Sequence, residues 1–144
     1  MLIKKHYHFY AGHRNHELSG KCSSWHGHRY GITIVISPER TTAGVTMLFA
    51  DIDEVAEKII KKYDHAMLIS RQDPYFRSMI SMKDSDGNSM KVVVFDNPTS
   101  VENLSERLYH ELYIAGLPLE SVLVKETDSS VVVYNHWDYK GETN

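Results

Sequence analysis

Hydrophobic and polar residues alternate in two segments near the N-terminus, residues 2–10 and 29–37. Both are rich in β-branched and aromatic side chains, and in the first of them aromatic residues alternate with histidines. A period of two is typical of a strand with one buried face, so we predict two strands here. Residues 121–127 and 130–136 have the same character. They flank Asp128-Ser129, which predicts a C-terminal hairpin with a tight turn.

Two other segments place apolar residues at helical spacing. The first covers residues 51–64, and the second runs from Thr99 to near Gly116. Each starts with a typical N-cap residue that is followed three positions later by a glutamate, Glu54 in the first and Glu102 in the second. We therefore predict two helices. Their apolar stripes consist of Ile52, Val55, Ile59, Ile60 and Tyr63, and of Val101, Leu104, Leu108 and Leu112.

The resulting order is two strands, two helices and two strands, which favours an α+β fold. We expect a four-stranded antiparallel sheet with two helices packed on one face, and its open edges favour assembly of several copies. Residues 70–90 are irregular and contain a turn-like stretch at 84–88, so we predict an insertion with a hairpin, followed by a strand signal at 91–95. Because no repeat or linker divides the chain, residues 1–144 are expected to form a single domain.

Composition narrows the classes of partner. Sixteen Lys and Arg against nineteen Asp and Glu leave a net charge of -3, so no general positive field attracts nucleic acid. The apolar runs are far shorter than the ~20 residues of a membrane helix, and the N-terminus has no apolar signal core. We expect a cytoplasmic protein with neither membrane nor nucleic-acid partners. The single cysteine, Cys22, excludes an intramolecular disulfide and fits a reducing compartment.

Candidate chemistry is concentrated in residues 22–28, where His26 and His28 flank Gly27. In extended backbone, residues two apart project from the same face, so both imidazoles can reach one ion. His13 follows the first predicted strand and would lie near this pair if the two strands form a hairpin. Three imidazoles with an open fourth position are typical of a catalytic zinc site, whereas a structural zinc site normally uses several cysteines.

The alternative is that these histidines are accidental neighbours, because the chain has nine of them and contains a second such pair at His6 and His8. Nothing near that second pair completes a metal site, and surface histidines explain it. Cys22 has two interpretations as well. A lone cysteine is usually a small buried hydrophobe, but the polar loop around it and neighbouring Lys21 would favour a reactive thiolate.

Two further positions with acidic residues each have a chemical and a structural interpretation. Asp64-His65 lies where the first predicted helix ends, and a histidine there can be an acid/base group or only a favourable partner of the helix dipole. Glu126 interrupts an apolar strand. Its carboxylate could face solvent, or it could accept a pair of N–H groups from a heterocycle.

Taken together, these motifs resemble the 6-pyruvoyltetrahydropterin synthase/6-carboxytetrahydropterin synthase family. The resemblance spans most of the chain, from Phe9 to Tyr134, and the three-residue gap between Cys22 and His26 is most similar to the bacterial 6-carboxytetrahydropterin synthase branch. The matching positions are His13, Cys22, His26, Gly27, His28, Asp64, His65, the segment Asn97-Pro98-Thr99-Ser100 with Glu102, and Lys125-Glu126-Thr127.

The resemblance implies a role for each of these residues. The implied zinc ligands are His13, His26 and His28, and the implied proton-transfer residues are Cys22, Asp64 and His65. Glu126 would anchor the pterin, and Thr99 and Ser100 would line its site, while Glu102 would cap a helix or touch the ring. The family's tunnelling fold joins the sheets of several subunits into a barrel, usually a hexamer built from two trimers. Its active sites lie between subunits, so Cys22 of one chain is expected to meet Asp64 and His65 of another.

The implied reaction converts 7,8-dihydroneopterin triphosphate into 6-carboxy-5,6,7,8-tetrahydropterin, acetaldehyde and triphosphate, as in the synthesis of the 7-deazaguanine precursor of queuosine. The alternatives are 6-pyruvoyltetrahydropterin synthase activity on the same substrate and a non-catalytic, zinc-stabilised binding module. The chain departs from the family pattern at Gly12, Asn15 and Ile69, and the insertion at 70–90 adjoins Asp64-His65. The available cations for the triphosphate are Lys21, Arg14 and Arg29.

Overall fold

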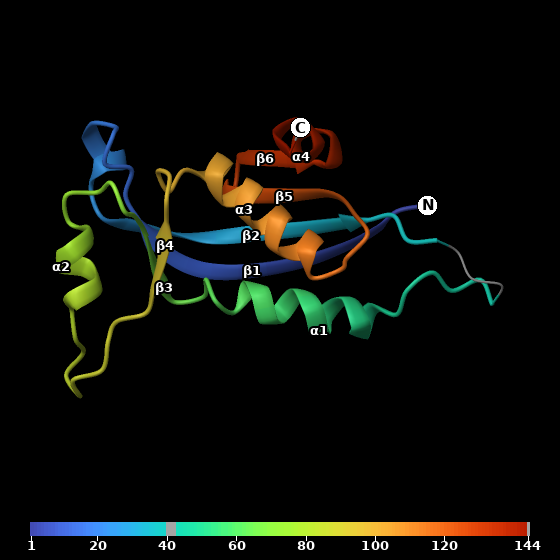
Figure 1. Cartoon of the computed structure of the whole chain (residues 1–144), viewed down its shortest axis with the longest axis horizontal. Coiled ribbons are helices and arrows are strands. Elements are labelled where there is room, and N and C mark those ends of the chain that lie inside the picture. The colour runs from blue at the N-terminus through green and yellow to red at the C-terminus, as the bar shows by residue number, and fades with distance from the viewer. Residues whose placement is uncertain (40–42, 144) are drawn as a thin grey trace.

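A long antiparallel hairpin forms the centre of the computed structural model, which describes residues 1–39 and 43–143 (Figure 1). Strand β1 (Ile3–His13) pairs with β2 (His26–Ile36) over the full length of both, from Ile3 opposite Ile36 to His13 opposite His26. The alternation predicted for β1 is confirmed, because Phe9 and Ala11 are buried while Tyr10 between them is exposed. Both strands extend three residues further toward the connecting loop than the sequence pattern indicated.

The sheet has six strands in the order β4-β3-β1-β2-β5-β6. The C-terminal hairpin of β5 (Leu119–Thr127) and β6 (Ser130–Asn135) is confirmed and extends the sheet on one side. On the other side β3 (Ala66–Ser70) and β4 (Val92–Phe95) add parallel pairs. The prediction of a four-stranded, wholly antiparallel sheet was therefore wrong. β3 is only five residues long and directly follows a helical pattern, so its sequence carries no separate strand signal.

Helices cover one face of this sheet (Figure 1). The two predicted helices are α1 (Phe49–Ile60) and α3 (Val101–Ile114), and their apolar stripes pack into a core with the inner face of β1, β2 and β5. The structure adds three short helices, which are η1 (Gly20–Ser23), α2 (Phe76–Ser81) and α4 (His136–Thr143). The sheet is not closed, so the α+β architecture presents strand edges. No described helix is both long and apolar enough to cross a bilayer.

The predicted helix starts need correction at both helices. α1 begins at Phe49, two residues before Asp51, and its N-cap residue, Leu48, makes no side-chain capping hydrogen bond. α3 is capped by Ser100, which accepts a hydrogen bond from the Asn103 N–H. Thr99 does not cap it, because its hydroxyl donates instead to a main-chain carbonyl of the loop after β1. A Ser directly after a Thr offers two caps, and only packing decides between them.

The predicted insertion contains both regular and irregular structure. It holds helix α2, and an antiparallel bridge between Lys83 and Ser89 confirms the expected hairpin around 84–88. The strand signal at 91–95 is confirmed as β4. The expected unit of residues 1–144 includes residues 40–42 and 144, which lie outside the described part of the chain.

Candidate metal centre and active site

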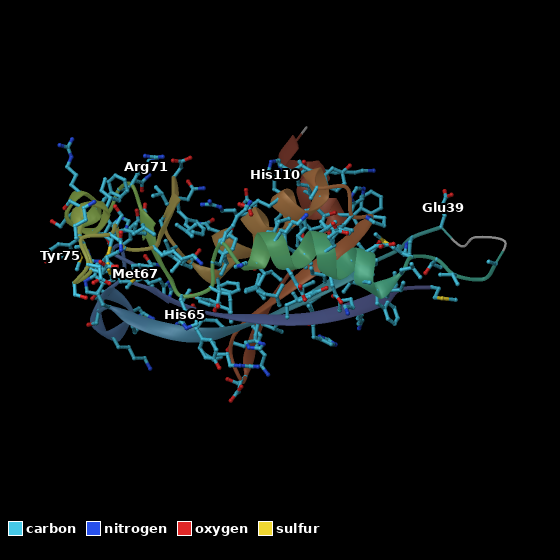
Figure 2. The ribbon with its side chains drawn as sticks, turned by 90° about the horizontal axis from the view of Figure 1, so that it is seen from below. Glu39, His65, Met67, Arg71, Tyr75 and His110 are labelled. Carbon is cyan, nitrogen blue, oxygen red and sulfur yellow. The ribbon has the colours of Figure 1, made fainter. Side chains whose placement is uncertain are left out.

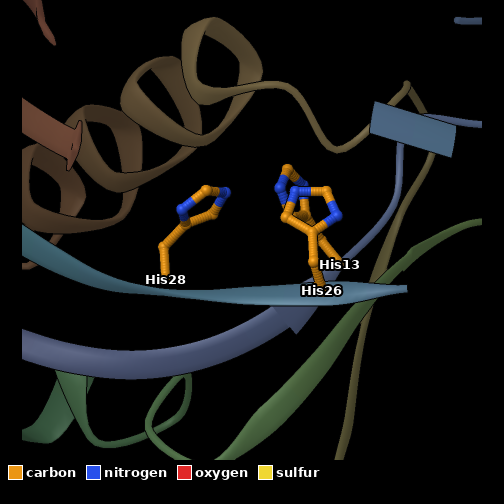
Figure 3. A group of neighbouring side chains, drawn as sticks. All are labelled: His13, His26 and His28. Carbon is orange, nitrogen blue, oxygen red and sulfur yellow. The ribbon is translucent and has the colours of Figure 1, made fainter. Parts of the chain in front are cut away.

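Three histidines converge where the β1–β2 hairpin meets its connecting loop (Figure 3). His13 ends β1 and pairs with His26 at the start of β2, while His28 lies two residues further along the same face. Their ring centroids are 4.6 to 5.1 Å apart, and one candidate ligand atom from each lies within 4.8 Å of the other two. The predicted cluster is thus assembled by a single hairpin.

Main-chain carbonyls orient two of the three rings. The His13 Nδ1 atom donates to the Thr99 carbonyl oxygen at 2.8 Å, and the His26 Nδ1 atom donates to the Ser24 carbonyl oxygen at 2.7 Å. Both rings therefore have Nε2 available for a ligand. The Nε2 atoms of His13 and His28 are buried and have no hydrogen-bond partner among the described residues, which is costly unless something else binds there. Three imidazole nitrogens are a suitable donor set for zinc.

Burial favours the neutral form of two imidazoles of the cluster, those of His13 and His28. Burial lowers the pKa of His13 to about 4 against the opposing effect of the hydrogen bond to Thr99, and His26 and His28 lower that pKa further. Burial also lowers the pKa of His28, against the opposing charge of Glu126. Neutral imidazole is the form that coordinates a metal, so His13 and His28 need not lose a proton near pH 7.

Glu126 faces this cluster from the neighbouring strand. Its Oε1 atom lies 3.5 Å from Nε2 of both His13 and His28. The pairing of β5 with β6 shifts register between Lys125 and Thr127, so Glu126 occupies a bulge. Val122 and Val124 of the same strand are fully buried, and strand alternation puts Glu126 on this inner face, where its half-buried carboxylate points to the cluster rather than to solvent. The solvent-facing alternative for Glu126 is therefore wrong.

A cavity of about 490 Å³ opens beside the cluster. Cys22 borders it and is exposed, which excludes a role as a buried hydrophobe. Ser100 and Glu102, from the start of α3, line another wall, and Lys21 lies at the cavity as well. Thr99 is buried behind this wall, where its carbonyl holds His13. The arrangement places a thiol, a carboxylate and a candidate metal centre around one space.

Asp64 and His65 lie apart from that cavity. The His65 Nδ1 atom is 2.9 Å from Asp64 Oδ2, and the pair is tied to the outer side of β1 because the Tyr10 N–H donates to Asp64 at 3.0 Å. That main-chain hydrogen bond and the one from His65 lower the pKa of Asp64. His65 is largely exposed and borders a second, methionine-rich cavity with Met67 (Figure 2). Within one chain, the structure does not bring this pair to Cys22.

The remaining sequence candidates are also placed. Arg14 is fully engaged by a buried carboxylate, and Arg29 lines cavities on the sheet face opposite Cys22, so only Lys21 of the three proposed cations borders the Cys22 cavity. His6 and His8 are exposed on that opposite face, which confirms them as surface residues.

The sequence analysis missed Tyr30, which is completely buried beside the cluster. Its ring centroid lies 5.4 Å from that of His28 and 6.2 Å from that of His13, and its hydroxyl has no hydrogen-bond partner. Burial and then the charge of Glu126 raise its pKa, so the phenol stays protonated. Its position two residues after His28 was the available signal, since that spacing puts both on one face.

The fold and the three-histidine cluster define a class of α+β protein with a candidate metal centre, and comparisons with known proteins name its family. Residues 2–136 match the profile of 6-pyruvoyl tetrahydropterin synthase. The chain is 30% identical over 107 residues to the 6-carboxy-5,6,7,8-tetrahydropterin synthase of Rickettsia conorii, covering 73% of this chain and 75% of that one. A "probable" enzyme of that name from Halobacterium salinarum is 31% identical over 120 residues, or 81% and 75% of the two chains.

Solved structures agree on the fold. A Wolinella succinogenes protein matches with a TM-score of 0.72 at 18% identity and covers 94% of this chain and 98% of its own. The 6-pyruvoyl tetrahydropterin synthase of Caenorhabditis elegans matches with a TM-score of 0.69 at 20% identity, covering 94% of each chain. The chain belongs to the 6-pyruvoyl tetrahydropterin synthase family, a family of lyase-type enzymes, and the named relatives support its 6-carboxytetrahydropterin synthase branch.

Proposed function

We propose that the protein is a zinc-dependent 6-carboxytetrahydropterin synthase. It would convert 7,8-dihydroneopterin triphosphate into 6-carboxy-5,6,7,8-tetrahydropterin with release of acetaldehyde and triphosphate, and so supply 7-deazaguanine synthesis toward queuosine. The observation that carries this proposal is the convergence of His13, His26 and His28 with Cys22 and Glu126 around one cavity. The names of the relatives direct it to this reaction rather than to another one.

In this proposal His13, His26 and His28 hold the zinc ion through imidazole nitrogens. The ion, when bound, acts as a Lewis acid that lowers the pKa of the substrate's side-chain hydroxyls. The unpartnered Nε2 atoms of His13 and His28 support the assignment, because a metal would satisfy both. Tyr30 closes the space behind the rings and excludes water from it.

Proton transfer is assigned to Cys22, Asp64 and His65. The Cys22 thiolate would take a proton from the substrate side chain that lies in the cavity it borders. Asp64 accepts a hydrogen bond from His65 Nδ1, which leaves His65 Nε2 to deliver or take the second proton. Such a pair fixes the tautomer of its histidine, so Asp64 acts on the rate through His65.

Binding of the pterin ring is assigned to other residues that line or support the same cavity. Glu126 would accept two N–H groups of the ring, and a carboxylate is well suited to this because it has acceptor oxygens only. Ser100 lines the cavity and Thr99 supports it from behind through the His13 hydrogen bond. Fixing the ring in this way determines which side-chain carbon faces the metal.

The two halves of the proposed site belong to different chains. Cys22 and the Asp64–His65 pair lie on opposite faces of one sheet, so a complete set requires a second copy. The open sheet edges support joining of sheets, and we propose a homohexamer of two trimers in the cytoplasm, with small-molecule substrate as the only other partner.

Product analysis tests the proposal. Zinc-loaded protein is incubated with 7,8-dihydroneopterin triphosphate beside the Cys22→Ala variant, and the products are identified by mass spectrometry. We expect a carboxytetrahydropterin and acetaldehyde from the wild type and loss of turnover in the variant. A pyruvoyl product would move the protein to the 6-pyruvoyltetrahydropterin synthase reaction. Zinc binding without turnover would favour a non-catalytic module, and full activity of Cys22→Ala would remove its assigned role.

A further inference from the structure

Arg14, the residue after His13, is largely enclosed, with a side chain that is 13% exposed. Its Nε and Nη2 atoms each donate to one carboxylate oxygen of Asp73 at 2.8 Å, and the Asp73 side chain is only 1% exposed. The guanidinium carbon lies 5.3 Å from the ring centre of Trp25 and 4.7 Å from that of Tyr75. With its charge paired and two aromatic rings packed beside it, the Arg14 guanidinium leaves little surface for a phosphate.

The enclosed side chain also holds the loop that carries Cys22. The Arg14 Nη1 atom donates to the Ser23 carbonyl at 3.0 Å. Ser23 directly follows Cys22 and directly precedes Ser24, whose carbonyl orients the His26 ring. One guanidinium therefore restrains the chain between Cys22, a proposed proton-transfer residue, and His26, one of the proposed ligands.

The main chain of Arg14 makes a second connection to the cluster. Its carbonyl accepts a hydrogen bond from the Thr99 hydroxyl at 3.0 Å, and the Thr99 carbonyl orients the His13 ring. Arg14 is thus hydrogen-bonded to Thr99, whose carbonyl orients His13. It is also hydrogen-bonded to Ser23, the residue before Ser24, whose carbonyl orients His26.

We propose that Arg14 and Asp73 form a positioning pair that sets the orientation of the His13 and His26 rings and the path of the Cys22 loop. The inference deepens the proposed function, on which it rests. It gives residues 70–90 a role, because Asp73 and Tyr75 come from that segment, and Tyr75 lies at the end of the molecule that carries α2 (Figure 2). The segment supports the proposed metal site through its contacts with Arg14, and none of its residues is among those that line the Cys22 cavity.

The surroundings of Asp73 favour the charged form of its carboxyl group. Burial alone would raise the pKa of its carboxyl, but hydrogen bonds from Arg14 and from the Tyr75 N–H outweigh burial and keep the pKa below its ordinary value. Removing one partner of the ion pair leaves the other without its counter-charge. Substitutions of Arg14 or Asp73 should therefore disturb the loop strongly.

Zinc affinity is the first test, measured by competition with a chromophoric chelator. We expect Arg14→Lys and Asp73→Asn to weaken zinc binding by about ten- to a hundredfold, the usual effect of removing a hydrogen bond that orients a ligand. The matched controls are Arg71→Lys and Asp96→Asn. This pair has the same 2.8 Å contact between neighbouring segments but is largely exposed, so we expect less than about a twofold change.

The fluorescence of Trp25 is sensitive to the same loop, and measuring it needs neither metal nor substrate. In a Trp137→Phe background it is the only tryptophan, and loss of the stacked guanidinium should shift its emission and increase quenching by acrylamide. Tyr75→Leu is a milder variant at an exposed position, which should preserve the fold where an ion-pair variant does not. We expect it to increase quenching and to weaken zinc binding by about two- to fivefold.

The inference fails if zinc affinity and Trp25 emission of Arg14→Lys, Asp73→Asn and Tyr75→Leu match those of the two controls. Loss of turnover with both properties unchanged would overturn it too, because Arg14 would then act on substrate directly. An inactive wild type that binds zinc normally, and whose zinc affinity depends on Asp73, would refute the proposed reaction and leave the positioning pair intact.

Discussion

At the scale of single residues, the site depends on which atoms are left without partners. The Nδ1 atoms of His13 and His26 are held by carbonyls, while Nε2 of His13 and His28 have none, and Glu126 places an oxygen 3.5 Å from both of these Nε2 atoms. A carboxylate in that position can bind substrate or complete a metal's ligand set. These two roles lead to different behaviour of one conservative variant.

We expect Glu126→Gln to keep its zinc and lose substrate binding. Replacing one acceptor oxygen with an NH₂ group sets a donor against a ring N–H, which should lower kcat/KM by about ten- to a hundredfold, mainly through KM. Zinc content by mass spectrometry and steady-state kinetics measure this. Glu120→Gln, an exposed position on the same strand, is the control. Loss of zinc from Glu126→Gln would instead make Glu126 a ligand.

The lowered pKa of His13 predicts how the metal-free protein responds to acid. The folded-state pKa of about 4 lies below the ordinary 6.5, so between these values the unfolded state binds more protons. Stability is therefore greatest above pH 6.5 and falls as the pH approaches 4, with a slope from this group of up to about 1.4 kcal/mol per pH unit.

Urea unfolding of the chelator-treated protein at several pH values measures that slope. His13→Gln should flatten it, whereas His6→Gln should not, because His6 is exposed. Equal slopes in the two variants would show that His13 is not buried in its neutral form.

At the scale of elements, the turn between α1 and β3 places a histidine where the backbone favours glycine. His65 has a φ of 58°, in the left-handed region that costs most residues about 1 kcal/mol or more. Its N–H donates to the Tyr10 carbonyl at 2.6 Å, so the turn docks on β1 in this conformation. An imidazole retained at such a position points to its chemistry rather than to stability.

We expect His65→Asn and His65→Gly to fold at least as well as the wild type and to lose activity. Asn and Gly tolerate the left-handed conformation, so the midpoint of thermal unfolding should stay the same or rise. The kcat should fall by about 10²- to 10⁴-fold, as expected when an acid/base group is removed. Calorimetry and turnover assays measure both properties. Retained turnover in both variants would remove His65 from the mechanism.

At the scale of the whole molecule, one sheet divides the proposed catalytic groups. Cys22 borders the cavity on the helix-covered side, and the Asp64–His65 pair is tied to the outer side of β1. A single chain cannot supply both groups to one substrate. If the site is shared, two inactive variants can repair each other.

Mixing Cys22→Ala with His65→Asn chains, after joint unfolding and refolding, should restore turnover. At equal amounts and random assembly, about a quarter of the sites would receive both intact groups. Each variant refolded alone serves as the control, and light scattering checks that all samples assemble equally. Mixed assemblies without activity would show that the two groups do not share a site.

Several features of this protein are determined by its sequence alone. The alternation in β1, β2 and the C-terminal hairpin, and the stripes of α1 and α3, are local patterns that follow from burying one face of each element. The spacing of His26 and His28 puts both on one face for the same reason. His13 joined them because two strands so close in sequence pair as a hairpin.

Only the tertiary structure decided the rest. β3 and β4 form parallel pairs between segments distant in sequence, and although residues 91–95 have a strand pattern, nothing in the local sequence indicates which strand each of the two pairs with. The approach of Glu126 to His13 and His28 depends on the pairing of β5 with β2. Whether Arg14 meets a substrate or a buried Asp73 depends on where the chain after β3 returns. These are outcomes of long-range packing, which a local pattern of residues does not encode.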